Sequence, residues 1–141
     1  MSDMSYKGYS ARIEYDAFGN LVAQTDALGR VTRFKYDRLN RMVEKQYPGG
    51  TVERMTWDAV GNVLTTVDTS GRTTTFAYDA EGWLVSVTTP DGPITFEKEP
   101  HGYLASVTYP GGAQRRYKYM EAGYSDSTSR TGLLTGIIDE N

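Results

Sequence analysis

The chain has 141 residues and a formal net charge of -3, which argues against a large nucleic-acid footprint. It contains 15 Gly and 11 Tyr but only 38% hydrophobic residues, so short strands joined by Gly turns are favoured over helices around a thick core. The absence of Cys excludes disulfides and thiolate metal ligands, and no apolar run of about 18 residues or signal-peptide pattern is present.

A turn motif that begins with an aromatic residue and Asp recurs along the chain. Four well-formed copies begin at Tyr15, Tyr36, Trp57 and Tyr78, each 21 residues after the last, and weaker copies begin at Lys98 and Tyr119. A fixed period of this length is typical of a repeat protein. We expect the repeats to be anchored structurally by Tyr15, Asp16, Gly19, Tyr36, Asp37, Trp57, Asp58, Gly61, Tyr78, Asp79, Gly82 and Tyr119.

Each repeat contains two segments of strand length that are rich in Val, Thr and aromatic residues. The first kind is represented by residues 21–25 and the second by residues 31–36. Because successive strand residues point to opposite faces, Phe34 and Tyr36 should share a face, while Arg33 and Lys35 take the other. The pattern predicts an aromatic ladder on one face of the sheet.

Two turns per repeat connect these segments. Asp at the first turn position can bond the backbone two residues later, and Gly at the fourth position accepts the chain reversal, as in Asp16 to Gly19. Asn40 replaces Gly in the second copy. The prediction is an all-β array of antiparallel β-hairpins with about eleven or twelve strands, forming one curved sheet or a partial barrel.

The chain divides by these patterns into four parts. Residues 1–7 are interpreted as a start segment, residues 8–124 as the repeats, residues 125–131 as a polar loop and residues 132–141 as a truncated further repeat. The copy at Lys98 comes one residue early, so we infer that one residue is lost at the turn near Gly92, which keeps Phe96 in its aromatic position. Lys98 then replaces the anchoring Tyr.

The repetition also decides between structural and chemical interpretations. A catalytic pair need occur only once, so the repeated Tyr-Asp pairs indicate turns. A calcium site built from Asp16, Asp26, Asp68 or Asp79 is an alternative, but these residues lack the spacing of a compact calcium loop. His101 should be an exposed turn residue, since nothing supplies a partner for general base catalysis. The sequence thus predicts no catalytic residue, no metal ligand and no cofactor.

Two basic stretches could instead bind an acidic ligand or cargo, although a solvated sheet face is the simpler interpretation. Tyr and Trp beside Arg would also suit a carbohydrate or nucleic-acid platform, but their regular placement favours a structural role. The stretches comprise Arg30, Arg33, Lys35, Arg38, Arg41 and Lys45, and then Arg115, Arg116 and Lys118.

Tyr-Asp-x-x-Gly-Asn-Leu, followed by Asp-x-x-Gly-Arg-Val-Thr and a further Tyr-Asp, resembles the pattern of the RHS or YD repeat family over about residues 8–139. The resemblance is to the shells of bacterial RHS polymorphic toxins and of the C-component of insecticidal toxin complexes, and more distantly to the YD shell of teneurins. It implies a β-sheet that spirals into a hollow shell, which in the bacterial members encloses a toxic domain. No Asp-Pro dipeptide occurs here, so the family's self-cleavage site is assigned to no residue.

This resemblance implies a non-catalytic segment of a toxin-enclosing shell, secreted or exported from a bacterium. Its partners would be further repeats of the parent shell, a toxin cargo, or another copy joined through open strand edges, with no nucleic acid and no membrane insertion. The alternative is an extracellular adhesion module that presents the sheet face to a glycan or protein. Solvent exposure of Trp83, Tyr103 and Tyr124 would favour that alternative, whereas their burial would favour the shell.

Overall fold

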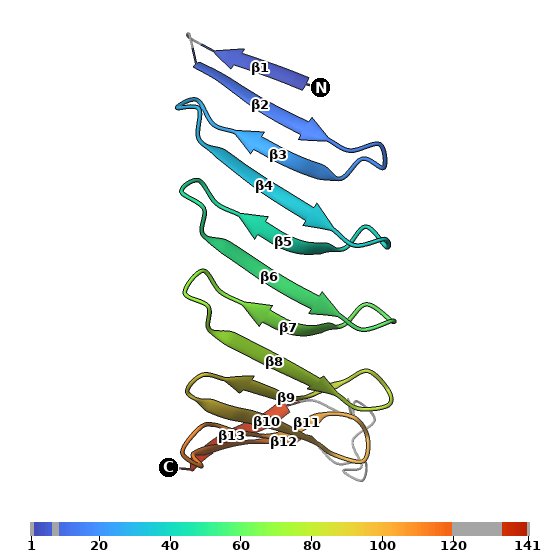
Figure 1. The fold of residues 1–141 in the computed structure, drawn as a ribbon. Coiled ribbons are helices and arrows are strands. Elements are labelled where there is room, and N and C mark those ends of the chain that lie inside the picture. The colour runs from blue at the N-terminus through green and yellow to red at the C-terminus, as the bar shows by residue number, and fades with distance from the viewer. Residues whose placement is uncertain (1, 7–8, 120–133, 141) are drawn as a thin grey trace. The chain divides into compact units, whose positions relative to one another are not determined.

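The computed structural model describes residues 2–6, 9–119 and 134–140, which form thirteen β-strands (Figure 1). The chain divides into two compact units, Met1–Thr73 and Thr74–Asn141. In this described part of the chain no helix is long and apolar enough to span a bilayer. The predicted all-β array of antiparallel hairpins is confirmed.

The first unit pairs its strands in chain order, each antiparallel to the next. Its turns therefore alternate between the two sides of Figure 1, with the Tyr-Asp turns on the right. The strands are β1 (Ser2–Tyr6), β2 (Tyr9–Tyr15), β3 (Leu21–Thr25), β4 (Val31–Tyr36), β5 (Met42–Gln46), β6 (Val52–Trp57) and β7 (Val63–Val67).

The second unit continues the same hairpin pattern, beginning with a strand that starts at the unit boundary. Its strands are β8 (Thr73–Tyr78), β9 (Leu84–Thr89), β10 (Gly92–Lys98), β11 (Leu104–Thr108), β12 (Gln114–Tyr119) and β13 (Leu134–Glu140). The polar loop predicted at residues 125–131 lies outside the described residues.

Residues 2–6, for which the sequence predicts no strand, form β1 and pair with β2 from Ser2↔Ile13 to Tyr6↔Tyr9. This segment contains no copy of the repeat motif, so periodicity alone could not reveal it. It brings the strands to thirteen rather than the expected eleven or twelve. Residues 21–25 and 31–36 form β3 and β4 with the bounds that the sequence predicts.

Each repeat contains a β-bulge beside its anchor. Tyr36 pairs with Met42 while Lys35 pairs with Glu44, so the extra residue on β5 is Val43. The same shift occurs beside the anchors at 15, 57, 78, 98 and 119. A bulge bends its strand and increases the local twist. Strict alternation therefore fails at the ends of these strands.

The units are built as a single layer of strands, so little is buried. Among the described residues, the buried apolar side chains are Ala23 and Val107, Ser106 is the buried polar one, and no large side chain is fully enclosed. The two faces nevertheless differ. On β4, Arg33 and Lys35 are exposed while Phe34 and Tyr36 are half-buried, as the alternation predicts.

The shortened turn also agrees with the sequence. Gly92 pairs with Thr89, which leaves Pro90 and Asp91 as a two-residue hairpin loop. Farther along β10, Phe96 pairs with Val107 and is half-buried. One residue is thus removed at the turn without moving the aromatic position.

Candidate functional site

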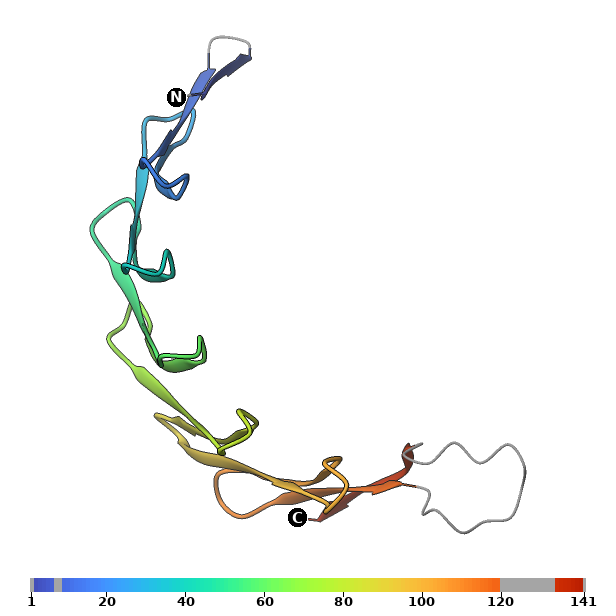
Figure 2. The same ribbon diagram turned by 90° about the vertical axis from the view of Figure 1, so that its right-hand side faces the viewer.

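The Tyr-Asp turns of the first unit project from the same side of its strand layer, which makes them the most distinctive surface of this unit (Figure 2). We call the turns at residues 16–20, 37–41 and 58–62 the turn row. Each turn begins directly after a strand whose last residue is aromatic, and it closes within five residues.

The Asp carboxylate organises each turn. In the first turn, Asp16 Oδ1 accepts hydrogen bonds from the backbone N–H groups of Phe18 and Asn20, both at 2.9 Å. The main chain closes the same turn, because Asp16 N donates to Asn20 O at 2.9 Å and Gly19 N donates to Asp16 O at 3.2 Å. The Gly19 φ of +86° is a left-handed conformation that favours glycine. Asp37, Asp58 and Asp79 accept equivalent bonds.

These bonds stabilise the ionised carboxylates. The side-chain amide of Asn20 lowers the pKa of Asp16, and the guanidinium of Arg41 lowers the pKa of Asp37. At Asp58, desolvation works in the raising direction, but the hydrogen bonds from Asn62 and the turn N–H groups outweigh it and leave the pKa lowered. The Asp oxygens therefore hold the turn instead of facing an open metal site. Among the described residues no group of three or more His, Asp or Glu side chains is arranged to hold a metal ion.

Side chains from one turn bind the next. Asn20 Nδ2 donates to Asn40 Oδ1 at 2.9 Å, which joins the first and second turns. Arg41 pairs with Asp37 at 2.7 Å, lies 5.6 Å from the ring centroid of Trp57, and donates through Nη1 to the carbonyl oxygen of Asp58. The three turns are therefore linked into one row.

The anchoring aromatics connect consecutive hairpins as well. Tyr36 donates its hydroxyl hydrogen to Leu21 O at 2.9 Å, and Trp57 donates from Nε1 to Met42 O at 2.8 Å. Tyr15 differs from the predicted ladder, because its side chain is 52% exposed. Tyr15 lies in the first hairpin that carries the motif.

In the second unit the anchors vary more. Asp79 pairs with Lys98, whose ammonium also lies 5.1 Å from the ring centroid of Trp83. The ammonium is the leading cause of the lowered pKa of Asp79. Tyr119 stacks on Tyr103 with 5.0 Å between ring centroids. Lys98 therefore replaces the missing aromatic anchor with an ion pair and a cation–π contact. Tyr78 lies at its predicted strand end and Gly82 in its predicted turn with a left-handed backbone, as does Gly61 in the first unit.

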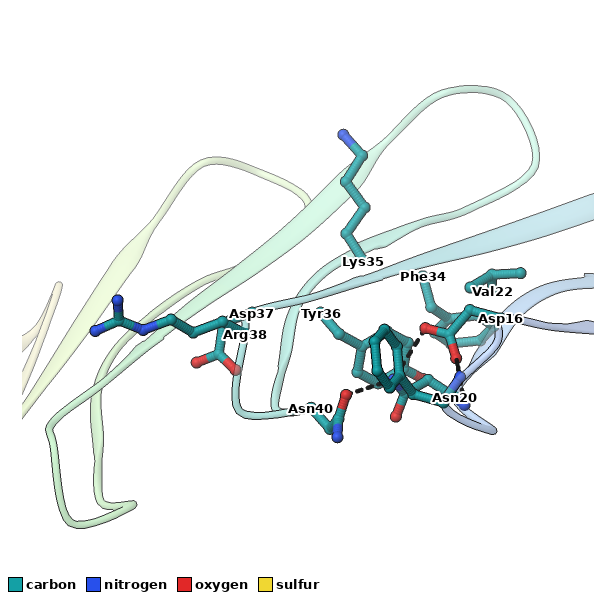
Figure 3. A pocket seen from close by; sticks show the side chains of 10 residues that line it. Asp16, Asn20, Val22, Phe34, Lys35, Tyr36, Asp37, Arg38 and Asn40 are labelled. Carbon is teal, nitrogen blue, oxygen red and sulfur yellow. Dashed lines mark hydrogen bonds between the residues drawn. The ribbon is translucent and has the colours of Figure 1, made fainter.

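Two hollows lie between the turns of the row. The first has a volume of about 640 Å³, and its wall includes Phe18. Val22, Phe34 and Tyr36 also line it (Figure 3). The second has a volume of about 480 Å³ and is lined by Leu39, Arg41, Trp57 and neighbouring turn residues. Each turn of the row has an apolar residue at its third position. These residues are largely exposed, with exposed fractions of 81% for Phe18, 57% for Leu39 and 84% for Val60.

Among the other candidates from the sequence, Arg38 lines both hollows, and Lys35 is one of the residues around the first. His101 is exposed in the turn before β11. On the opposite sheet face, Lys35 and Arg54 both pair with Glu44, at 2.8 and 3.1 Å. Arg115 pairs with Asp139 on β13. Trp83 and Tyr103 are exposed, and Tyr124 lies outside the described residues.

The linked turn row is the feature that the repeat period did not reveal. Its key contacts join residues 17 to 20 positions apart, such as Arg41 with Asp58 and Asn20 with Asn40. The signal in the sequence is the polar residue that follows each turn Gly or Asn, found at Asn20, Arg41 and Asn62.

The fold and the turns together define a β-hairpin repeat protein. The family model described as RHS Repeat matches residues 15–52 and 57–94, more than half of the chain. The chain belongs to the RHS repeat family.

Toxin protein Tse5 of Pseudomonas aeruginosa is 48% identical over 42 residues, a match that spans 30% of this chain and 3% of that protein. Among solved structures, the TcdB2-TccC3-Cdc42 crystal structure matches 79% of the chain with a TM-score of 0.65 at 23% identity. A Tc holotoxin pore of Photorhabdus luminescens matches 79% with a TM-score of 0.63 at 22% identity. Because the identity to these solved structures is below 25%, the likeness shows only that the fold is shared. The chain spans only 6% of the length of those solved chains.

Proposed function

We propose that this chain is a non-catalytic wall segment of an RHS-repeat shell that encloses a toxin or effector cargo. The observation that carries the proposal is the single layer of hairpins, in which almost no described side chain is buried. A wall one layer thick buries its surfaces only against further protein, such as neighbouring repeats or enclosed cargo. Membership of the RHS repeat family and the likeness to Tse5 support the same role.

The role also agrees with how the polar groups that recur in the repeats are used. The Asp carboxylates hold turns, and the Tyr and Trp polar atoms bind neighbouring backbone carbonyls. These groups build the wall and leave no activated nucleophile or base among the anchors. Export from a bacterium is part of this proposal and follows from the nature of the toxin relative.

Protease protection of the natural polypeptide that carries this segment tests enclosure. The flanking gene region should encode further Tyr-Asp copies and a downstream domain. We expect that domain to resist trypsin in the native protein and to be digested once urea opens the shell. Digestion at the same rate as the free domain would refute enclosure, as would stop codons on both sides of this segment.

An extracellular binding module is the second candidate, because Trp83 is 56% exposed and Tyr103 is 38% exposed. Exposed aromatic rings suit glycan or protein partners. A labelled form of the protein that binds bacterial or host cell surfaces, and loses that binding on Trp83→Ala, would favour this candidate. Equal binding by Trp83→Ala and the parent protein would exclude Trp83 as its contact.

A further inference from the structure

The turn row combines exposed apolar side chains with hollows at a regular spacing. Phe18, Leu39 and Val60 occupy the same position in three consecutive turns of the first unit, and all three are mainly exposed. The first hollow has mainly apolar walls, including Phe18, Val22 and Phe34, whereas the second combines Leu39 and Trp57 with charged turn residues. The surface therefore alternates projecting side chains with recesses large enough for an aliphatic side chain.

The row is also preorganised. The bond from Asn20 to Asn40 and the bonds from Arg41 to Asp37 and Asp58 join its turns before any partner arrives. A surface already held in its binding conformation loses less conformational entropy on association. These side-chain links would thus increase affinity as well as stability.

The spacing selects the kind of partner. Consecutive turns are separated by two strands, or about 9.6 Å. Residues seven apart on an α-helix are separated by about 10.5 Å along the axis and lie on nearly the same face. Side chains on one face of an extended strand recur at about 6.7 Å or its double, which fits neither the turns nor the hollows. A helix with one apolar residue per heptad matches two consecutive hollows.

The charges of the row add a second requirement. The carboxylates of Asp16, Asp37 and Asp58 are engaged by their own turns, and Arg41 is engaged by Asp37. Arg38, which lines both hollows, is exposed at the centre of the row. An acidic residue on the partner would therefore complement the row, whereas a second copy would bring another Arg38 to the same place.

From this geometry we propose that the turn row is a docking surface for an acidic amphipathic α-helix of a partner protein. One apolar side chain per heptad enters each hollow, small residues face Leu39, and a Glu of the helix pairs with Arg38. This inference goes beyond the wall role and does not require that a cargo be enclosed.

The test uses the full chain and a fluorescently labelled 21-residue peptide, rich in Ala, with one Leu per heptad and flanking Glu residues. Fluorescence anisotropy should show saturable binding. Leu39→Ser should raise the Kd about tenfold, while the matched control Leu28→Ser, at a turn on the opposite edge where Leu28 is 72% exposed, should leave it unchanged. Circular dichroism of each variant verifies that the sheet is retained.

A charge exchange provides the second arm. Arg38→Glu should weaken binding of the Glu peptide at least fivefold, and a peptide with Lys in place of Glu should restore binding to that variant. Three results would overturn the proposal: no saturable binding, equal binding of a peptide with Leu at alternate residues and a central Pro, or equal loss with Leu28→Ser. Concentration-dependent dimerisation that Leu39→Ser abolishes, without peptide binding, would assign the row to a second copy instead.

Discussion

Asn40 allows a direct test of how the turns are stabilised. It has a φ of +59° and is the one non-glycine residue with positive φ in the described part of the chain, at the position where the first, third and fourth copies have Gly. Its side chain also accepts the bond from Asn20 that joins the first two turns. Two demands, a left-handed backbone and a linking amide, therefore meet at one residue.

Asn40→Ala and Asn40→Gly separate these demands, because both remove the amide and only Ala opposes the left-handed backbone. Loss of an exposed hydrogen bond costs about 0.5–1 kcal/mol. An L-residue with Cβ in the left-handed region adds about 1–2 kcal/mol. We therefore expect Asn40→Gly to lower the free energy of unfolding by about 0.5–1 kcal/mol and Asn40→Ala by about 1.5–3 kcal/mol.

The assay is urea unfolding followed by circular dichroism and by the fluorescence of Trp57 in a Trp83→Phe background. Both probes are needed because repeat arrays can depart from two-state behaviour. Ala59 provides the matched control, since it lies in the next turn without a positive φ. At this position Ala59→Gly should lower the free energy of unfolding by about 0.4–1 kcal/mol, so Ala is preferred over Gly, the reverse of the order expected at residue 40. Equal stability of Asn40→Ala and Asn40→Gly would refute the argument from backbone conformation.

Three further predictions follow from the contacts of the repeats. Tyr36→Phe should lower the free energy of unfolding by about 0.5–1.5 kcal/mol in urea titrations, because Leu21 O loses its donor; an unchanged midpoint would contradict this. Arg41→Met should lower the urea midpoint and alter Trp57 emission, whereas Arg30→Met, at an exposed ion pair on the opposite edge, should do neither. Acid should destabilise the fold, because hydrogen bonds lower the folded pKa values of Asp16, Asp37 and Asp58 below the ordinary value of 3.8. The contribution of these carboxylates to the free energy of unfolding is therefore present above that pH and is lost as the pH falls through the folded pKa values. Replacing Asp37 by Asn should reduce this acid dependence of the melting temperature.

The sequence predicted the hairpins because local chemistry determines them. Asp16 and Gly19 specify their own turn, and Val31 to Tyr36 have the alternation of a strand with one exposed face. The period then places the other hairpins that carry the motif, but it does not reveal the hairpin of β1 and β2, because residues 2–6 contain no copy of the motif. The lost residue near Gly92 could be inferred in the same way, since Phe96 had to keep its position.

Contacts between repeats were harder to predict because they depend on register. The β-bulge that inserts Val43 opposite β4 leaves no mark in a strand of ordinary composition. Tyr15 carries the same motif as Tyr36, yet its side chain is half exposed. The sequence shows that Lys98 replaces an aromatic anchor. Its ion pair with Asp79 and its contact with Trp83 could not be predicted, because they depend on the distance between two adjacent turns.

The two-residue loop at Pro90 and Asp91 has a consequence for how such genes can change. Thr89 pairs with Gly92 across that loop, and one residue is missing there relative to the neighbouring repeats, yet Phe96 still pairs with Val107. Insertions and deletions on this edge are therefore absorbed inside one hairpin. A deletion in a Tyr-Asp turn would also separate the side chains that link that turn to its neighbours. Drift in repeat length should accordingly accumulate on the edge of the array opposite the Tyr-Asp turns.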